Sequence, residues 1–88
     1  MQKFLILDSK DNVAVATELI EAGTIIQLTD GKEITIKDLI PFAHKFSLAD
    51  LTAGDSIFKY GEIIGIATAS VKTGEHVHVH NIKGVHMG

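Results

Sequence analysis

The chain lacks cysteine, arginine and tryptophan altogether, and it contains a single proline. Without cysteine, neither a disulfide framework nor a thiolate metal site can form. Without arginine there is no bidentate clamp for carboxylates or phosphates, so an anionic ligand would depend on lysine, histidine or backbone N–H groups. The formal net charge is −3, whereas a nucleic-acid-binding protein needs a basic face. The composition therefore argues against a nucleic-acid partner.

Long hydrophobic runs are also missing. No apolar stretch approaches the ~20 residues that a membrane-spanning helix needs. Residues 1–8 are too short and too quickly acidic for a signal peptide. We therefore expect a cytoplasmic protein with no membrane partner. A length of 88 residues with 45% hydrophobic content predicts one small domain, residues 1–88, with one core.

The apolar residues occur in short bursts that are rich in β-branched side chains and bounded by glycine, aspartate and asparagine, as is typical of β-strands. The predicted strands are 4–7, 13–16, 24–28, 33–36, 46–48, 56–60, 63–68 and 76–80. Asp30-Gly31 predicts a two-residue hairpin between the third and fourth of them. An alternative for residues 12–20 is an amphipathic helix capped by Asp11. We expect an all-β fold with at most one or two short helical turns.

A short pattern recurs three times along the chain. It consists of an apolar residue, a polar residue, a small residue and glycine, at residues 20–23, 51–54 and 71–74. Glycine supplies the positive φ that tight turns require at little steric cost. Each copy therefore predicts a strand, a tight turn and a second strand.

Three histidines alternate with valines near the end of the sequence. On a strand, His76, His78 and His80 would share one face at a spacing of ~7 Å, while Val77 and Val79 would face the core. Neutral imidazoles at that spacing can converge on one divalent metal ion, and iron(II), manganese and zinc all suit imidazole. The alternatives are a solvated strand face, acid–base work, or hydrogen bonds to a hydroxylated substrate. The pattern alone does not separate them.

Other polar residues have plain structural explanations. Asp11 and Asn12 lie in a polar loop between two predicted strands, where turn chemistry accounts for them. His44 and Lys45 follow the only proline and enter a strand, which is typical of a solvated strand start. The sequence contains no nucleophile motif and no phosphate-binding glycine loop.

A series of short motifs nevertheless resembles one known family. In order, they match the N-terminal domain of altronate and galactarate dehydratases over about residues 11–81. The motifs are DNVAVA (11–16), IP (40–41), HKF (44–46), AG (53–54), IFKYG (57–61), IGIA (64–67) and GEHVHVHN (74–81). That domain belongs to the SAF group, so the resemblance implies a β-clip, a small all-β fold of bent hairpins.

The resemblance also implies a function. It implies the small subunit of a sugar-acid hydro-lyase, inactive alone, which contributes a histidine-bearing strand to an active site shared with a large subunit. A chain that ends soon after the histidine segment is similar to the small subunits of members that are divided into two chains. One alternative is the small subunit of a sulfolactate sulfo-lyase, which eliminates sulfite instead of water. Others are a carbohydrate-binding or partner-binding SAF module, and a purely structural lid or dimerisation domain.

Site residues and ligands follow from the same resemblance. The family's dehydratases use a divalent metal, commonly iron(II), with manganese or zinc as alternatives here. The residues expected to be catalytic are His78 and His80. The alternation described above gives His76, His78 and His80 as the expected metal ligands, and His76 lies beyond the family's common motif. The expected substrate-binding residues are Asp11, Asn12, His44, Lys45 and Asn81. The expected partners are the large catalytic subunit and a sugar acid, with a homo-oligomer as a further possibility.

Overall fold

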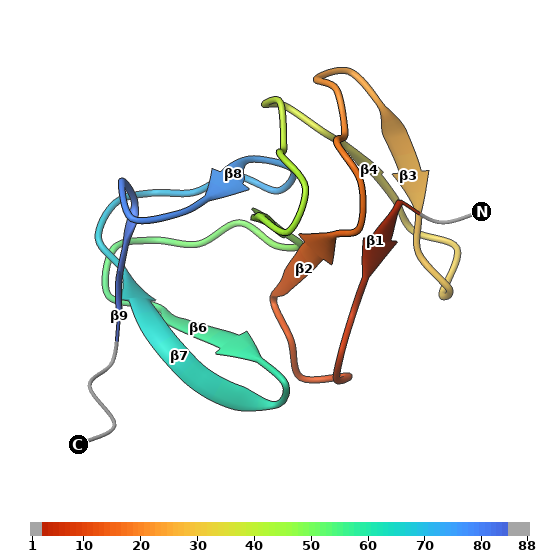
Figure 1. The fold of residues 1–88 in the computed structure, drawn as a ribbon. Helices are drawn as coiled ribbons and strands as arrows, with labels where there is room; N and C mark the ends of the chain where they lie inside the picture. The colour runs from red at the N-terminus through yellow and green to blue at the C-terminus, as the bar shows by residue number, and fades with distance from the viewer. Residues whose placement is uncertain (1–2, 85–88) are drawn as a thin grey trace.

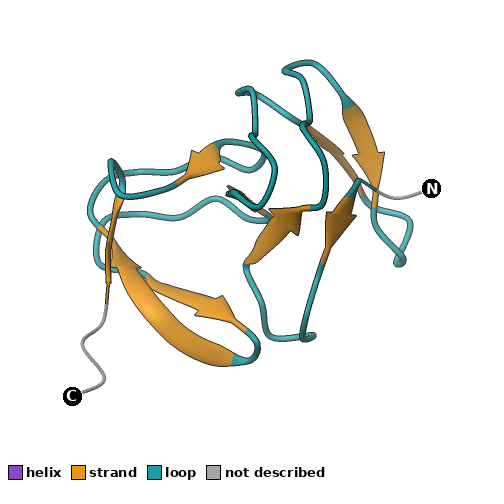
Figure 2. Ribbon diagram, viewed as in Figure 1, coloured by secondary structure: helices purple, strands orange, loops and turns teal. Residues whose placement is uncertain are grey.

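The protein is all-β over residues 3–84, the part of the chain that this computed structural model describes (Figure 1). Strands and loops alternate, and no helix occurs between residues 3 and 84 (Figure 2). A helix long and apolar enough to cross a membrane is likewise absent from this part of the chain. The strands are β1 (Phe4–Leu5), β2 (Val13–Ala16), β3 (Ile25–Gln27), β4 (Glu33–Thr35), β5 (Lys45–Ser47), β6 (Ser56–Lys59), β7 (Glu62–Ala67), β8 (His76–Val77) and β9 (Ile82–Gly84).

The all-β prediction is confirmed, and the helix alternative for residues 12–20 is wrong. β2 is an inner strand of a four-stranded sheet in the order β1-β2-β5-β8, and its register places Ala14 opposite Phe46. Both edges of β2 are hydrogen-bonded, and three of its four side chains are buried. A strand therefore satisfies this segment better than an amphipathic helix with one solvated face.

Two hairpins extend from this sheet at opposite ends of the molecule (Figure 1). β3 and β4 form the first, and β6 and β7 form the second, to which β9 adds a third strand. The β6–β7 hairpin bends at a register shift between Ile57 and Phe58, as β-bulges generally do. The expectation of bent hairpins is therefore confirmed.

The turn between β3 and β4 is longer than the two-residue loop predicted. Leu28 and Lys32 form the last backbone pair at 2.8 Å, and the Gly31 N–H donates to the Leu28 carbonyl at 2.9 Å. Gly31 has a φ of 89°, as in a type I turn followed by a left-handed residue. The carboxylate of Asp30 accepts the Lys32 N–H at 2.9 Å and holds this wider loop.

The recurring glycine pattern marks a repeat of the backbone path. The Gly23 N–H donates to the Ile36 carbonyl at 2.7 Å, and 31 residues farther on the Gly54 N–H donates to the Ala67 carbonyl at 2.8 Å. The two glycines have φ of 90° and 99°, a region that costs other residues about 1–2 kcal/mol. The predicted strand, turn and strand are confirmed in both copies.

The same correspondence reveals a fourth turn, in which alanine replaces glycine. The Gly74 N–H donates to the Ser47 carbonyl at 2.8 Å, and 31 residues earlier the Ala43 N–H donates to the Ala16 carbonyl at 2.8 Å. Ala43 has a φ of 69°, and Gly74 has a φ of 91°. Antiparallel bridges link the turns in pairs: Ile20 with Ile40, and Leu51 with Val71. The chain thus contains two copies of one backbone path, offset by 31 residues.

The core divides into two clusters instead of the single core expected, and apart from Val13 of β2 the second cluster consists of residues of the second copy. Five buried positions of the first cluster recur in the second: Ile20 and Leu51, Ile26 and Ile57, Ile36 and Ala67, Ile40 and Val71, Phe46 and Val77. In the last three pairs the first copy carries the larger side chain. The ring of Phe46 also packs edge-on against Phe4, with centroids 5.9 Å apart. The first copy therefore buries more apolar volume.

The predicted strand over residues 76–80 is wrong in its second half. β8 ends at Val77, and the chain turns there because the Asn81 Oδ1 atom accepts the backbone N–H of His78 at 2.9 Å. Asparagine side chains that bond nearby backbone groups compete with sheet pairing. Val77 is buried as predicted, but Val79, which was predicted to face the core, is 80% exposed.

Candidate functional site: a histidine cluster beside β8

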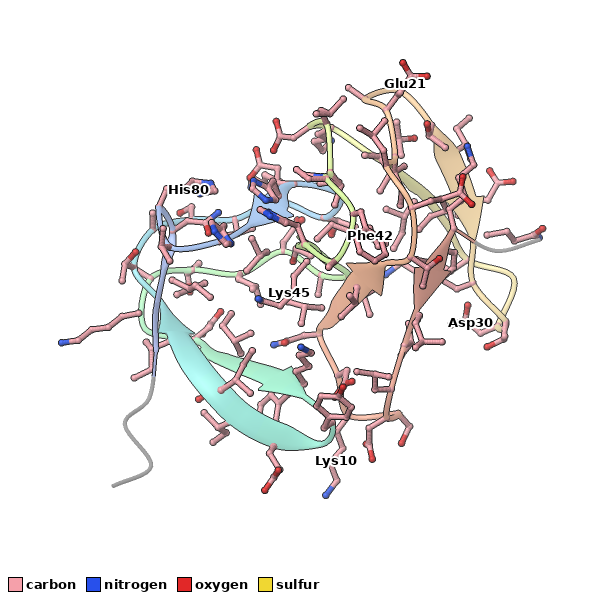
Figure 3. The ribbon with its side chains drawn as sticks, viewed as in Figure 1. Lys10, Glu21, Asp30, Phe42, Lys45 and His80 are labelled. Carbon is pink, nitrogen blue, oxygen red and sulfur yellow. The ribbon has the colours of Figure 1, made fainter. Side chains whose placement is uncertain are left out.

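Four histidine rings gather beside β8. The centroid of the His44 ring lies 4.5 Å from that of His78 and 5.1 Å from that of His76, and both pairs are stacked. The Nδ1 atom of His44 lies 2.9 Å from the Nε2 atom of His76, so one of the two nitrogens donates a hydrogen bond to the other. The ring of His80, labelled in Figure 3, lies 5.3 Å from that of His76.

Two of the repeated turns deliver these rings. His44 follows the turn that contains Ala43, and His76 begins β8 just after the turn that contains Gly74. β5 and β8 are antiparallel and pair Lys45 with Val77. The next position in that register brings His44 to the chain segment that carries His78, although the two are far apart in sequence.

The crowding of the rings lowers the pKa of two of them. Burial lowers the pKa of His76, the other three rings lower it further, and Asp38 opposes the shift. For His78, burial again contributes most to the lowered pKa, followed by His44 and Lys45. The lowered pKa values favour the neutral form of both imidazoles, and a neutral imidazole offers the lone pair that a metal ion needs.

Two polar side chains position the backbone under these rings. The buried amide of Asn81 accepts the His78 N–H through Oδ1 and donates to the His76 carbonyl through Nδ2, at 2.9 and 2.8 Å. The Asp38 carboxylate accepts the His76 N–H at 2.9 Å. Asn81 was expected to bind substrate. Its amide is hydrogen-bonded to the backbone here, and the substrate role stays a prediction. Sequence reasoning missed Asp38, which precedes His76 by 38 residues in an ordinary polar turn.

Asp11 and Asn12, also expected to bind substrate, hold the second hairpin. The Asp11 carboxylate accepts the backbone N–H groups of two residues in the β6–β7 turn, at 3.1 and 2.9 Å. The Asn12 amide accepts the Phe58 N–H at 2.8 Å and donates to the Ser56 carbonyl at 2.9 Å. These bonds account for both residues structurally, and their contact with a substrate stays a prediction.

Lys45 lies beside the histidines on β5. Its side chain is half-buried, and burial lowers its pKa, with a smaller contribution from the charge of Lys59. Figure 3 shows the Lys45 side chain between the four-stranded sheet and the β6–β7 hairpin. A lysine in this place is a cation that an acid substrate could approach, and its expected substrate role stays a prediction.

The cluster matches a three-imidazole metal site in size and chemistry. One nitrogen each of His44, His76 and His78 lies within 4.8 Å of the others. Two nitrogens bound to one ion are at most about 4.2 Å apart, given metal–nitrogen bonds of about 2.1 Å, so the rings would have to move closer together to share an ion. This group differs from the expected trio of His76, His78 and His80. His44 was expected to bind substrate instead, and the role of His80 as a ligand stays a prediction.

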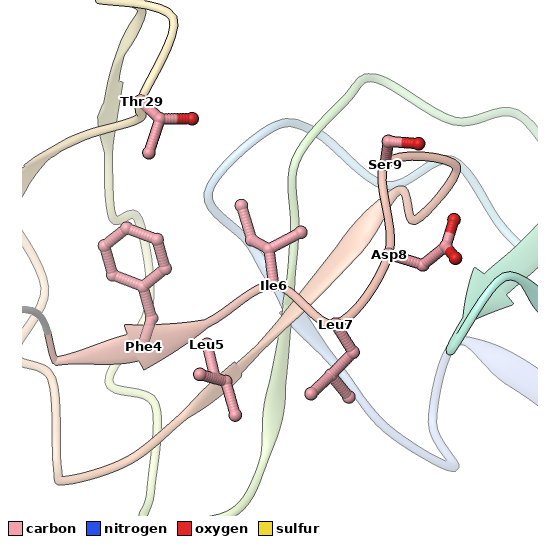
Figure 4. A pocket seen from close by; sticks show the side chains of 7 residues that line it. All are labelled: Phe4, Leu5, Ile6, Leu7, Asp8, Ser9 and Thr29. Atoms are coloured by element: carbon pink, nitrogen blue, oxygen red, sulfur yellow. The ribbon is translucent and has the colours of Figure 1, made fainter.

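Open grooves lie elsewhere on the surface. One, of about 400 Å³, runs along β1 and the following loop and is lined by residues 4–9 and Thr29 (Figure 4). A second, of about 360 Å³, shares Ile6, Ser9 and Thr29 with it and reaches Asp11. The histidine cluster lines neither groove. His44, His76 and His78 are half-buried and His80 is exposed, so the cluster lies at the surface.

Comparison with protein families decides which fold family this is. A family model described as the altronate/galactarate dehydratase SAF domain matches residues 2–85. The chain belongs to this family. The all-β sheets and bent hairpins agree with the β-clip fold that the sequence resemblance implied. The histidine cluster of this chain lies within the matched SAF domain.

Curated relatives of this SAF domain are of two kinds. Altronate dehydratase of Bacillus subtilis is 40% identical over 83 residues, which cover 94% of this chain and 16% of that protein. Altronate dehydratase of Escherichia coli is 36% identical, with 92% and 16% covered. The chain therefore spans about 16% of the length of these dehydratases. (2R)-Sulfolactate sulfo-lyase subunit alpha of Chromohalobacter salexigens is 36% identical, with 91% of this chain and 92% of that subunit covered.

Proposed function

We propose that this chain is the small, SAF-type subunit of a sugar-acid hydro-lyase and contributes the histidine cluster to an active site shared with a large catalytic chain. The observation that carries the proposal is the approach of His44, His76 and His78 within an altronate/galactarate dehydratase SAF domain. The histidine cluster lies at the surface of the domain and lines neither of the two grooves described above. A second chain would supply the remaining walls and the residues that the reaction lacks here.

The proposed reaction is an α,β-elimination. A base removes a proton from the carbon next to the carboxylate, the neighbouring carbon loses hydroxide, and the electrons of the C–H bond form the new double bond. His44, His76 and His78 would hold a divalent ion, with iron(II), manganese and zinc as candidates. Such an ion would act as a Lewis acid that stabilises negative charge on the substrate. His80 is exposed and adjoins the cluster, where its imidazole could exchange protons with substrate or solvent.

A sulfolactate sulfo-lyase is the second candidate. It is favoured by the match to 92% of the subunit alpha sequence of Chromohalobacter salexigens. The elimination is the same except that sulfite leaves in place of hydroxide. Both substrates carry a carboxylate, so Lys45 and His44, the cationic or hydrogen-bonding side chains expected to bind substrate, would bind either.

Reconstituted activity tests the proposal. The chain is combined with the large lyase chain of its source organism and assayed with altronate, galactarate and sulfolactate, with and without iron(II), manganese or zinc. We expect turnover of one substrate only when both chains are present. His76→Ala and His78→Ala should each lower kcat/KM by more than about 100-fold, because loss of even an outer-shell partner costs about 10–100-fold. Unchanged turnover in both variants would refute a role for the cluster.

A further inference from the structure

The two most exposed apolar side chains of residues 3–84 flank the histidine cluster. Among the large hydrophobic residues there, Val79 is 80% exposed and Phe42 is 69% exposed. Val79 follows His78 directly, and Phe42 precedes His44 by two residues. Because the rings of these two histidines stack at 4.5 Å, the segments that carry Val79 and Phe42 adjoin each other.

Two leucines extend this apolar surface beside Phe42. The segments 16–20 and 40–44 run antiparallel and are bonded at both ends, by Ala16 with residues 43 and 44 and by the bridge of Ile20 with Ile40. Leu19 and Phe42 lie between those bonded ends, and Leu39 precedes the bridge. Leu19 is 50% exposed and Leu39 is 52% exposed. We call Leu19, Leu39, Phe42 and Val79 the apolar collar.

The second copy of the fold shows what the same surface looks like when it is polar. Thirty-one residues after Leu19, Leu39 and Phe42 stand Asp50, Ser70 and Thr73. The N–H and Oγ1 groups of Thr73 both donate to the Asp50 carboxylate at 2.9 Å, so the corresponding positions in that copy are neighbours. The same backbone path thus carries polar side chains in the second copy and exposed apolar side chains in the first.

We propose that the apolar collar is the docking surface for the large catalytic chain, which would cover the histidine cluster. This inference rests on the proposed function. An exposed apolar surface beside a polar site is typical of a protein contact. The chemistry of the cluster favours this occupant over a second copy. Three neutral imidazoles leave the charge of a divalent ion uncompensated, so the covering face should bring anionic groups, such as carboxylates or a bound acid substrate. A second copy docked by the same surface would bring another such ion.

The test measures association between the full small chain and the large lyase chain of the source organism. That large chain is chosen by similarity to the part of altronate dehydratase that this chain does not match. The test variant combines Phe42→Thr and Val79→Thr; threonine is the residue of the second copy at the Phe42 position and has the shape of valine. The control is Ile25→Thr, the same change at a residue on β3 that is 63% exposed. Unchanged urea midpoints will show that each variant folds.

We expect the double variant to bind the large chain about 100-fold more weakly, as loss of central apolar contacts does, and Ile25→Thr to remain within about twofold. Zinc affinity of the isolated small chain should be the same in all three proteins. Wild-type affinity in the double variant would overturn the proposal and leave the proposed function intact. Loss of self-association instead would assign the surface to a second copy and also overturn it. If the wild-type chain binds neither the large chain nor zinc, the proposed function fails as well.

Discussion

The turn before β5 in the first copy of the fold carries Phe42, Ala43 and His44, and the corresponding turn in the second copy carries Thr73, Gly74 and Glu75. Their backbones make the same hydrogen bonds, and Ala43 accepts a φ of 69° to do so. The first turn presents an aromatic ring and an imidazole. The second is polar, and its Glu75 carboxylate accepts a hydrogen bond from the backbone N–H of Lys72 in the same turn. The comparison shows that the same few backbone hydrogen bonds define the turn in both copies. The candidate functional residues stand at positions where the side chains of the two copies differ. A strained non-glycine residue next to a candidate ligand fits that view.

The cores of the two copies should differ in their share of the stability, and this is the largest effect that we expect. Phe46→Ala should lower the free energy of unfolding by about 3–5 kcal/mol. Val77→Ala at the corresponding position should lower it by about 2 kcal/mol, since it removes two methyl-sized groups from a buried site. Urea unfolding measures both. If Phe46→Ala does not fold, the milder Phe46→Leu variant is measured in its place. Equal losses of unfolding free energy for Phe46→Ala and Val77→Ala would contradict the expected difference between the two cores.

The repeated turns should respond unequally to an exchange between glycine and alanine. Gly74→Ala should lower the free energy of unfolding by about 3 kcal/mol, because it adds a left-handed alanine and places its Cβ against the Thr35 carbonyl. Gly54→Ala meets no atom within 4 Å and should cost only about 1 kcal/mol. Ala43→Gly relieves the strain and should change stability by less than about 1 kcal/mol. Urea midpoints rank the three, and a Gly74→Ala protein as stable as wild type would contradict the steric argument.

Two asparagines clamp the chain in the same way but in different places, which allows a matched test. Asn81→Ala and Asn12→Ala each remove two hydrogen bonds between an amide and the backbone, so each should cost about 1–3 kcal/mol of stability. Only Asn81→Ala should also weaken zinc binding, since Asn81 holds the loop of His76 and His78. Titration calorimetry at a temperature where both variants are folded measures this. Equal zinc affinities in the two variants would show that the clamp does not position the rings.

The smallest expected effect is a dependence of the unfolding free energy on pH that arises from His76 and His78. The pKa values of His76 and His78 are lowered in the folded chain, so the unfolded chain binds more protons once the pH falls below about 6.5. The metal-free protein should therefore lose stability as the pH falls from about 6.5 through the lowered pKa values, and gain nothing further above it. Urea midpoints with a chelator at several pH values test this. The His76→Gln/His78→Gln variant should show a shallower dependence, and an identical curve would contradict the assignment.

Much of the fold was predictable because its signals are local. Short β-branched bursts marked the strands, and three glycines marked turns that require positive φ. The fourth turn escaped because Ala43 stands where glycine was the only signal sought. Had residues 40–43 been aligned with the other copies, His44 would have taken the position of Glu75, next in sequence to His76.

The candidate site was only partly predictable because it depends on contacts between distant segments. Alternation placed His76, His78 and His80 together, and it rested on a strand that continued to residue 80. The Asn81 side chain ends that strand, turns Val79 outward and leaves His80 at the edge of the group. The pairing of β5 with β8 brings His44 in from 32 residues away. Periodicity within one segment carries no information on either contact.

Zinc titration of the isolated chain tests the central claim most directly, because it asks which histidines act together. Wild type, His44→Ala and His80→Ala are compared by calorimetry at pH 7.5 or above, where we expect one zinc ion per chain in the wild type. His44→Ala should lose at least about 100-fold in affinity, and His80→Ala should change by no more than about tenfold, as for a residue outside the ligand set. Retention of zinc by His44→Ala with its loss in His80→Ala, or no zinc binding by the wild type, would contradict the account.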